Sequence, residues 1–419
     1  MREMKDSGFS WIGEIPTSWK MERVKHCFYR KNEKAMQEDP VVLSLARSGV
    51  RVRDISNNEG QIAESYYNYN PVDIDDLLLN PMDLYSGANC SISKVQGVIS
   101  PAYVNLRALN GTNPAFYDYY FKVQYWLMAF FSFGKGVSYE NRWTLTTDTL
   151  MNYPVVVPSY DEQCRVTDYL DEKCSKIDAV ISKQEQVVEK LKEYRVSVID
   201  EIVTKGLDKN VPMKDSGVVW IGNIPAHWDI RKLRTHTSMV TPMRDKPDQL
   251  DGEIPWIRIE DYDGKYISSS KEGFGVSEET IKEMNLKVYP VNSVLCTSSC
   301  DLGKCAIVAR ELVSNQRFIN IIPDDKLFPD YLYYLMLSNA KRLNHLSTGT
   351  IQANLSRVAF EHLIVQFPPV DEQKEIANYL DKKCGAIDKA ISMKQGVIDK
   401  LKEYKKSLIY EVVTGKKEV

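Results

Sequence analysis

Residues 168–204 read DYLDEKCSKIDAVISKQEQVVEKLKEYRVSVIDEIVT and contain neither glycine nor proline. Mostly apolar residues recur here at alternating steps of four and three, at Leu170, Cys174, Ile177, Ile181, Gln184, Val188, Leu191, Arg195, Val198 and Ile202. This is the a/d spacing of a coiled-coil seam. It predicts one helix about 55 Å long. Such a helix cannot bury its seam alone and needs a partner.

The partner follows 210 residues later, where residues 378–414 read NYLDKKCGAIDKAISMKQGVIDKLKEYKKSLIYEVVT. Its seam positions are Leu380, Cys384, Ile387, Ile391, Lys394, Ile398, Leu401, Lys405, Leu408 and Val412. The polar interruptions recur at the same places, and KLKEY stands at 190–194 and again at 400–404. Two such copies predict a duplicated architecture with the two helices packed against each other.

A second repeat opens each half of the chain. WIGEIPTSW at 11–19 returns as WIGNIPAHW at 220–228, and KDSG precedes both copies. Between the repeats lie a first body, about residues 20–160, and a second body, about 230–370, whose sequences barely match. The predicted domains are a first body with its lead-in, a spacer helix, a second body with its lead-in, and a second spacer helix with the tail, over residues 1–163, 164–206, 207–373 and 374–419.

The repeats indicate that the constant segments have the same structural role in both halves of the chain. The two variable bodies have related but different roles. Antiparallel packing of the helices is favoured and would place the bodies at opposite ends of a rigid rod with pseudo-two-fold symmetry. Parallel packing would place both bodies at one end. Polar seam residues fix the register at some cost in stability.

Each body is predicted to have an α+β fold. In the first body we expect strands at 41–45, 76–79, 102–106 and 153–157, a helix at 116–131 and a polar loop at 133–143. In the second we expect strands at 254–259, 294–297, 305–309 and 318–322, a helix at 329–337 and a polar loop at 347–355. An Asp-Glu-Gln sequence then opens each long helix, with Asp161 as the candidate N-cap of the first.

Composition indicates a globular protein, since 43% of the 419 residues are hydrophobic and 10% aromatic. No apolar run approaches about 18 residues and no signal peptide is evident, so we expect a cytoplasmic protein without a membrane span. Eight scattered cysteines suit a reducing compartment. Cys296, Cys300 and Cys305 lack the tight pairing that zinc prefers, so no metal is expected.

The chain contains no complete catalytic motif. Gly303-Lys304 lacks the rest of a phosphate-binding loop, and Gly273-Phe274-Gly275 lacks the third glycine of a dinucleotide fingerprint. Residues 80–82 and 367–369 resemble only fragments of a methyltransferase motif, and neither HExxH nor GxSxG occurs. Residues 323–326 are better explained as a solvated turn than as a nuclease acidic cluster. Catalysis by this chain is therefore not expected.

Side chains able to contact DNA are more evident, although the formal net charge of −3 is not typical of a nucleic-acid binder. Arginine pairs with guanine edges, glutamine and asparagine pair with adenine, and lysine and serine hold phosphates. In the first body the candidates are Arg47, Ser48, Arg51, Arg53, Lys94, Lys135, Ser138 and Arg142. In the second they are Arg258, Ser298, Lys304, Gln316, Arg317, Thr348, Thr350, Gln352 and Asn354.

Taken together, the sequence resembles the specificity subunit of a type I restriction-modification system over nearly its whole length. The resemblance is carried by the paired Trp-Ile-Gly-x-Ile-Pro-x-x-Trp lead-ins, the Asp-Glu-Gln segments at 161–163 and 371–373, the Tyr-Leu-Asp helix starts and Asn315-Gln316-Arg317-Phe318. Tyr160 departs from the family pattern, and the loop at 133–143 departs from it more than the loop at 347–355.

The resemblance implies two target-recognition domains separated by a long antiparallel two-helix coiled coil, each domain reading one half of a bipartite site in double-stranded DNA. It implies as partners two adenine methyltransferase (modification) subunits, which bind S-adenosylmethionine, and restriction subunits, which use ATP and Mg. The chain itself would bind no cofactor or metal and would catalyse nothing. One alternative is a coiled-coil scaffold joining two protein-binding modules without DNA specificity. Another is an unrecognised nuclease or methyltransferase.

Overall fold

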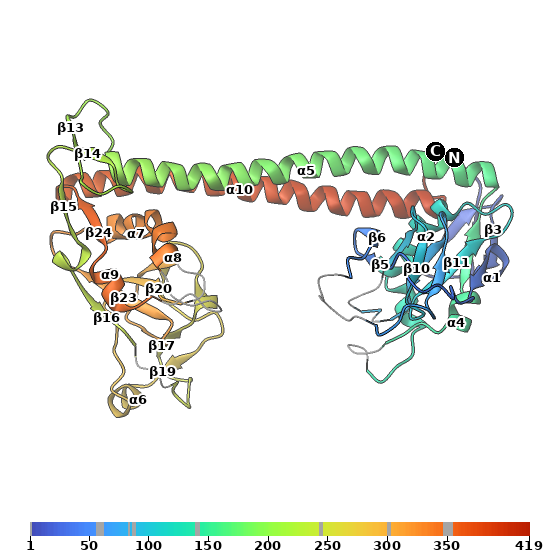
Figure 1. Cartoon of the computed structure of the whole chain (residues 1–419), viewed down its shortest axis with the longest axis horizontal. Coiled ribbons are helices and arrows are strands. Elements are labelled where there is room, and N and C mark those ends of the chain that lie inside the picture. Colours follow the sequence, from blue (N-terminus) through green and yellow to red (C-terminus); the bar gives the residue numbers. More distant parts are fainter. Residues whose placement is uncertain are drawn as a thin grey trace. The chain divides into compact units, whose positions relative to one another are not determined.

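The computed structural model describes residues 2–55, 63–82, 84–85, 89–138, 143–242, 246–299, 303–346 and 355–419. The chain forms two compact units: Met1–Glu185 with Gly396–Val419, and Gln186–Gln395. Two long helices, α5 (Tyr160–Lys205) and α10 (Val370–Val413), each begin in one unit and end in the other. Each unit therefore contains one body and a part of both long helices (Figure 1).

In the first unit the two long helices run antiparallel. Lys405 Nζ lies 2.6 Å from Asp178 Oδ2, and Lys402 Nζ lies 3.4 Å from Glu185 Oε1. As the residue number of the contact rises along α5, that of its partner falls along α10, which is the pattern of antiparallel helices. The seam positions Leu170, Cys174, Ile181, Ile398, Leu408 and Val412 are buried, while Ile177 and Leu401 are half-buried.

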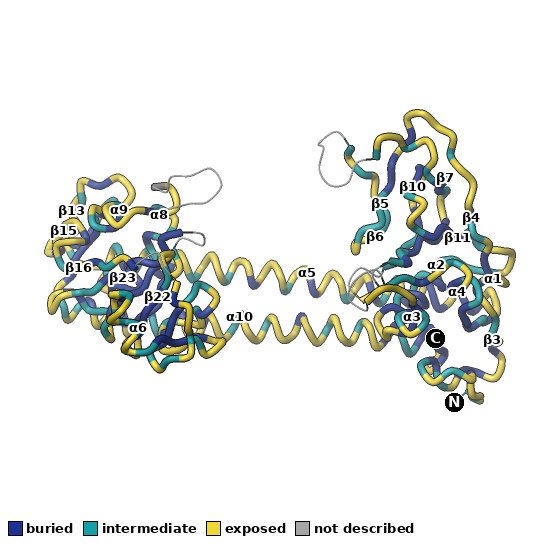
Figure 2. The backbone as a smooth tube through the Cα atoms, turned by 90° about the horizontal axis from the view of Figure 1, so that it is seen from below, coloured by how far each residue is buried: buried dark blue, intermediate teal, exposed yellow. Residues whose placement is uncertain are grey.

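The second unit repeats this packing. Arg195 Nε lies 3.0 Å from Asp388 Oδ1, and both residues stand 210 positions from their counterparts in the Lys405–Asp178 pair. The seam positions Val188, Val198, Leu380, Cys384 and Ile387 are buried, while Leu191 and Ile391 are half-buried. Figure 2 shows these buried positions recurring along otherwise exposed helices. The prediction of an α+β protein built on two long helices is confirmed.

The first long helix begins two residues earlier than a predicted N-cap at Asp161 implies. α5 starts at Tyr160, and the hydroxyl of Ser159 accepts a hydrogen bond of 3.3 Å from the backbone N–H of Glu162. Ser159 therefore caps the helix, and the prediction of Asp161 as the N-cap was wrong. Serine serves as well as aspartate because its oxygen also reaches the N–H groups of the first turn.

The first body is a four-stranded antiparallel sheet with the strand order β4-β11-β8-β9, packed against α2. Its elements are β3 Lys20–Arg23, α1 Val24–Cys27, β4 Phe28–Lys31, β5 Leu43–Ala46, β6 Gly49–Val52, β7 Asn70–Val72, β8 Leu77–Asn80, β9 Asn89–Ile92, β10 Gly97–Ile99, β11 Val104–Ala108, α2 Pro114–Trp126, α3 Ala129–Ser132, α4 Thr147–Met151 and β12 Pro154–Val157. Strand β12 pairs with β3.

The helix predicted at 116–131 is interrupted. Met128 has a φ of 55°, in the left-handed region, and it separates α2 from α3. A non-glycine residue in that region cannot continue a right-handed helix. The aromatic side chains of α2 explain why the segment was still predictable, since Phe116, Tyr117, Tyr120 and Phe121 are fully buried against the sheet.

The second body uses the same frame, with the strand order β16-β23-β20-β21-β18. Its elements are β15 Asp229–Lys232, a 3-10 turn Leu233–Thr235, β16 Thr237–Val240, β17 Ile254–Ile257, a 3-10 turn Ile259–Asp261, β18 Tyr266–Ile267, β19 Gly275–Val276, α6 Glu278–Glu283, β20 Val294–Thr297, β21 Cys305–Val308, β22 Val313–Ser314, β23 Phe318–Pro323, α7 Pro329–Ser338, α8 Ala340–Leu346, α9 Arg357–Glu361 and β24 Ile364–Phe367. Its first four strands repeat the order found in the first body, and β24 pairs with β15 as β12 pairs with β3.

The lead-in repeats form hairpins, β1 (Met4–Asp6) with β2 (Glu14–Pro16) and β13 (Met213–Asp215) with β14 (Asn223–Pro225). Each hairpin packs beside the end of a long helix. Gly415, with a φ of 75°, follows α10 and lies so close to Pro16 that a Cβ there would overlap the proline ring. No helix in the described part of the chain is long and apolar enough to span a membrane.

Candidate nucleic-acid interface

In both bodies the residue that follows the third strand in the sheet order, β8 or β20, is hydrogen-bonded to a residue at or just after the end of the late polar loop. In the second body, the backbone N–H of Leu355, the last residue of the late loop, donates to the carbonyl of Ser298 over 2.8 Å. In the first body, the N–H of Leu145 donates to the carbonyl of Pro81 over 2.8 Å. Ser298 follows β20 and Pro81 follows β8, and these two strands occupy the same place in their sheets. The two bodies therefore build equivalent loop clusters.

Four candidates of the second body lie in or beside its loop cluster. The N–H of Ser298 donates to the carbonyl of Arg317 over 2.8 Å, and the N–H of Thr297 donates to the carbonyl of Lys304 over 2.9 Å. Lys304, Gln316 and Arg317 are exposed, whereas Ser298 is buried. This group brings two cations and one amide, from two loops, to the end of β20, a combination suited to phosphates and base edges.

Arg258 has a different setting. Its guanidinium lies 2.9 Å from Glu272 Oε1 and 3.9 Å from Asp261 Oδ2, and it stacks 4.6 Å from the ring centroid of Phe274. The hydrogen bond that Arg258 donates to Glu272 raises the pKa of Arg258. DNA would have to compete with these internal acidic partners for the side chain of Arg258.

The first body places a basic hairpin beside its sheet. β5 and β6 are joined by a turn that contains Arg47 and Ser48, both exposed. Asn89, at the start of β9, donates from its side-chain amide to the carbonyl of Ala46 and so ties the turn to the sheet. Arg51 also lies on this hairpin and is exposed.

A groove of about 490 Å³ lies between the β5–β6 hairpin and the β10–β11 connection. Its lining includes Ser44, Arg53, Tyr69 and Tyr103. A hollow with a cation, a hydroxyl and two aromatic rings offers both charge and stacking surface to a nucleic acid.

The other first-body candidates lie elsewhere. Lys94 is exposed in the β9–β10 turn, at the opposite end of β9 from Asn89. Lys135 forms a backbone bridge with Thr144, and both Lys135 and Ser138 are exposed in the late loop. Arg142, Thr348, Thr350, Gln352 and Asn354 lie outside the described residues.

Part of the β8–β9 loop in the first body also lies beside the late loop, and no sequence prediction named it. Tyr85 has 62% of its surface exposed, and its ring centroid lies 6.4 Å from that of Phe131. The N–H of Leu84 donates to the carbonyl of Trp143 over 3.1 Å, which holds this loop beside the late loop. The signal that could have found it is the turn-rich segment at 80–88, which lies between strands β8 and β9.

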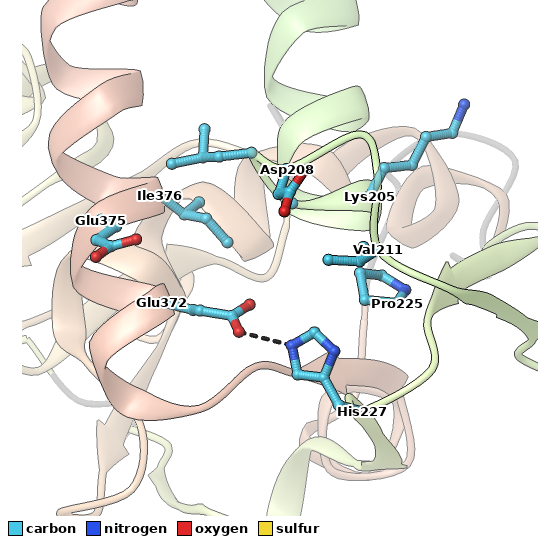
Figure 3. Close-up of a pocket in the computed structure, with 10 residues that line it drawn as sticks. Lys205, Asp208, Val211, Pro225, His227, Glu372, Glu375 and Ile376 are labelled. Atoms are coloured by element: carbon cyan, nitrogen blue, oxygen red, sulfur yellow. Dashed lines mark hydrogen bonds and ion pairs between the residues drawn. The ribbon is translucent and has the colours of Figure 1, made fainter.

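A second concave site lies in the second unit, at the start of α10 (Figure 3). This pocket of about 210 Å³ is lined by Lys205, Asp208, His227 and Glu372, among others. Glu372 Oε1 lies 2.6 Å from His227 Nε2, and its other oxygen accepts from the indole N–H of Trp228 over 2.7 Å. Among the described residues no group of three His, Cys, Asp or Glu side chains is arranged to hold a metal ion. The contacts of Glu372 with His227 and Trp228 at this pocket attach the lead-in to the long helix α10.

The corresponding contact in the first unit has a different partner. Glu162, the counterpart of Glu372, forms an ion pair with Arg2. The indole nitrogen of Trp19, the counterpart of Trp228, is buried without a hydrogen-bond partner. In both units a glutamate of the Asp-Glu-Gln segment therefore attaches the lead-in to a long helix, which is a structural role.

Comparison with known proteins identifies relatives among the specificity subunits of type I restriction enzymes. Residues 240–403 match the family model described as the type I restriction modification DNA specificity domain. The MjaIX specificity subunit of a type I restriction enzyme from Methanocaldococcus jannaschii is 32% identical over 166 residues, which are 38% of this chain and 38% of the relative. The MjaVIII specificity subunit from the same organism is 23% identical over 369 residues, covering 82% of this chain and 80% of the relative. The chain spans only 38% and 51% of the first two curated relatives that it matches.

Solved structures support the same fold. One chain, from a study of complex assembly and conformational transition of the type I R-M system, superposes with a TM-score of 0.73 at 12% identity, covering 95% of this chain and 98% of that chain. The HsdS subunit from Thermoanaerobacter tengcongensis superposes with a TM-score of 0.51 at 13% identity, covering 96% of this chain and 98% of that chain.

Proposed function

We propose that this chain is a specificity subunit of a type I restriction-modification system and that its two bodies each read one half of a bipartite DNA site. The observation that carries the proposal is the pair of equivalent loop clusters, built on the same sheet order from dissimilar sequences. A shared frame with different loops is what two readers of two different half-sites require. Base contacts specify the sequence, and the surrounding cations hold the backbone.

We propose that the chain is not catalytic and directs partner subunits to the DNA. It would bind two modification subunits, which carry S-adenosylmethionine, and restriction subunits, which use ATP and Mg. The exposed lysine and arginine side chains of each body would hold the duplex while the partners act. Cytoplasmic location follows from this role, because the DNA substrate lies there.

The long helices offer a docking surface for the modification subunits. Apolar side chains directly precede seam positions and remain exposed: Val180, Val397 and Tyr404 in the first unit, and Val187 and Tyr194 in the second. Val187 and Tyr194 recur 210 residues later as Val397 and Tyr404. Apolar residues flanking a two-helix seam suit a further helix with an apolar face. A surface present twice suits two copies of one partner.

Binding experiments on the complex of this chain with its modification subunits test the DNA proposal. Duplexes from a randomised pool should be enriched for two short sequence elements separated by a constant gap. The affinity for the enriched duplex should fall steeply as salt rises, because phosphate contacts release counterions. An absence of sequence enrichment would contradict the proposal. A complex insensitive to salt would favour the scaffold alternative, which relies on apolar docking.

Substitution of the duplicated tyrosines tests the docking surface. Tyr194→Ser and Tyr404→Ser together should lower the number of modification subunits bound per chain, measured by mass photometry. The matched control is Lys190→Ser with Lys400→Ser, on exposed positions of the same KLKEY motifs. Equal stoichiometry in both double variants would place the docking surface elsewhere.

A further inference from the structure

A buried glutamine attaches each body to its own long helix. In the first unit, Gln163 Oε1 accepts from the backbone N–H of Asn113 over 2.8 Å, and Nε2 donates to the carbonyls of Gly111 and Pro158 over 3.2 and 3.1 Å. Asn113 caps α2, the core helix of the first body. Gln163 has 0% of its surface exposed, so these bonds form away from water.

The second unit repeats this attachment with the same geometry. Gln373 Oε1 accepts from the N–H of Phe328 over 2.7 Å, and Nε2 donates to the carbonyls of Lys326 and Pro368 over 2.9 and 2.8 Å. Phe328 directly precedes α7, the core helix of the second body. The amide uses its acceptor and its donors in both units, so the glutamine of each Asp-Glu-Gln segment is a fixed joint.

A second contact joins the same pairs of helices further along. In the first unit, the hydroxyl of Tyr119 on α2 donates to Asp171 Oδ1 on α5 over 2.6 Å. In the second unit, the hydroxyl of Tyr334 on α7 donates to Asp381 Oδ1 on α10 over 2.7 Å. Asp171 and Asp381 are the acidic residues of the duplicated Tyr-Leu-Asp sequences.

Two contacts between a body and its long helix fix the angle between them, whereas a single contact would let the body rotate about that point. Gln163 and Asp171 are about 12 Å apart along α5, and Asn113 and Tyr119 are about 9 Å apart along α2. A rotation of about 10° around the glutamine joint would move a loop about 20 Å away by about 3.5 Å, close to the rise of one base pair. Because the sheet packs on α2, such a rotation would carry the candidate interface with it.

The second unit holds its body with one additional group. Lys265 Nζ lies 2.6 Å from Asp381 Oδ1 and 2.5 Å from Asp330 Oδ1, and it lies 5.1 Å from the ring centroid of Tyr334. Lys265 belongs to the segment that leads into β18, so it ties the sheet edge of the second body to α10 independently of the tyrosine hydroxyl. In the first unit, Lys122 on α2 instead pairs with Asp118 of its own helix over 2.6 Å.

We propose that the Tyr119–Asp171 and Tyr334–Asp381 hydrogen bonds are positioning contacts that fix the angle of each body on its long helix, and thereby set the number of base pairs tolerated between the two half-sites. This inference rests on the proposed reading of a bipartite site. The tyrosines and aspartates touch no base in this account. They act through the loops that each body carries.

The test is a gap series with the complex of this chain and its modification subunits. Methylation rates are measured on duplexes whose half-sites are separated by the native gap, or by one base pair more or fewer. Tyr119→Phe removes a single hydroxyl group, and we expect the preference for the native gap to fall by at least about threefold, in line with the loss of a hydrogen bond to a charged acceptor. Tyr29→Phe, an exposed tyrosine on β4 of the same body, is the matched control and should keep the wild-type preference.

The additional lysine makes the expected effects unequal. Tyr334→Phe alone should change the gap preference less than Tyr119→Phe, because Lys265 still holds Asp381. Combining Tyr334→Phe with Lys265→Met should bring the effect to that of Tyr119→Phe. Asp171→Asn, which keeps an acceptor oxygen for Tyr119, should retain the preference that Asp171→Ala loses.

A merely structural role gives a different result. It would lower the thermal midpoint of the variants and reduce methylation at all gap lengths by the same factor, and this outcome overturns the inference. An unchanged gap profile in Tyr119→Phe overturns it as well. If the wild-type complex itself has no preference for a bipartite site, the proposed function fails, which is distinguishable from failure of the positioning contacts alone.

Discussion

Lys405 and Asp178 form a cross-helix ion pair of 2.6 Å at a polar interruption of the coiled-coil seam. The equivalent interruption in the second unit, Arg195, pairs with Asp388 over 3.0 Å. Polar seam residues therefore have defined partners in both units. Such pairs specify which residues of the two helices face each other more than they add stability, because partly exposed ion pairs contribute about 0–1 kcal/mol.

Exchanging the charges tests this register role. Asp178→Lys alone opposes two cations across the seam and should lower the thermal midpoint slightly, while Asp178→Lys with Lys405→Asp should restore it. The coupling between the two substitutions should be on the order of 0.5 kcal/mol. Thermal unfolding of the four proteins of this cycle measures it. Strictly additive effects would show that the two side chains do not interact.

The apolar seam should be far less tolerant. Leu191→Asp or Leu401→Asp places a charge without a partner at a half-buried seam position, and each should destabilise the helix pair by about 2–4 kcal/mol. Circular dichroism during thermal unfolding checks this expectation. Lys190→Asp, one residue away on an exposed position, is the control and should change stability little. If the leucine variants behave like this control, the seam assignment is wrong.

The stability of the first unit should depend on pH through a charge cluster. Asp76 is fully buried and lies 2.9 Å from Lys31 Nζ, and Lys31 Nζ also lies 2.8 Å from Asp73 Oδ2. Arg107 Nη2 lies 2.6 Å from Asp73 Oδ2. The hydrogen bond from Lys31, with help from Arg107, lowers the pKa of Asp73.

A carboxyl group whose pKa is lower in the folded state contributes stability that is fully present above its unfolded pKa, about 4. This contribution is lost as the pH falls through the folded pKa. The thermal midpoint should therefore fall on acidification below about pH 4, and the slope should be shallower in Asp73→Asn. Calorimetry between pH 2 and 7 measures the difference. Equal slopes in both proteins would exclude Asp73 as the group responsible.

Arg317 offers the sharpest single-residue test of DNA contact in the second body. Arg317→Ala should weaken binding of the preferred duplex by about 1–3 kcal/mol if the side chain pairs with a base, and should relax the second half of the sequence only. A contact to phosphate would instead weaken all duplexes and reduce the salt slope by about one. Fluorescence anisotropy over a salt series separates these cases. Unchanged affinity would remove Arg317 from the interface.

Much of the fold was predictable because its signals are local. The seam residues of α5 and α10 are spaced for one buried stripe, and strands such as β8 and β20 are short apolar runs with defined ends. The break at Met128 and the cap at Ser159 were missed, since each depends on a backbone conformation that residue type only weakly favours.

The candidate site was predictable only in outline. The residue types that suit DNA could be named, and Ser298, Lys304, Gln316 and Arg317 do lie in or beside one loop cluster. The ion pair of Arg258 with Glu272 could not be foreseen, because the two residues are 14 positions apart and no local pattern links them. The shared strand order was equally hidden, since it is a property of the tertiary structure and not of any stretch of sequence.

The most direct measurement is a map of methylated adenines in cells that carry this chain with its modification subunits, compared with cells in which residues 20–157 are replaced by the corresponding body of a relative. We expect a bipartite methylated motif in the first case. In the second, only one half of that motif should change, while the other half persists. A change in both halves, or a methylated motif that is continuous from the start, would contradict the reading of DNA by two separate bodies.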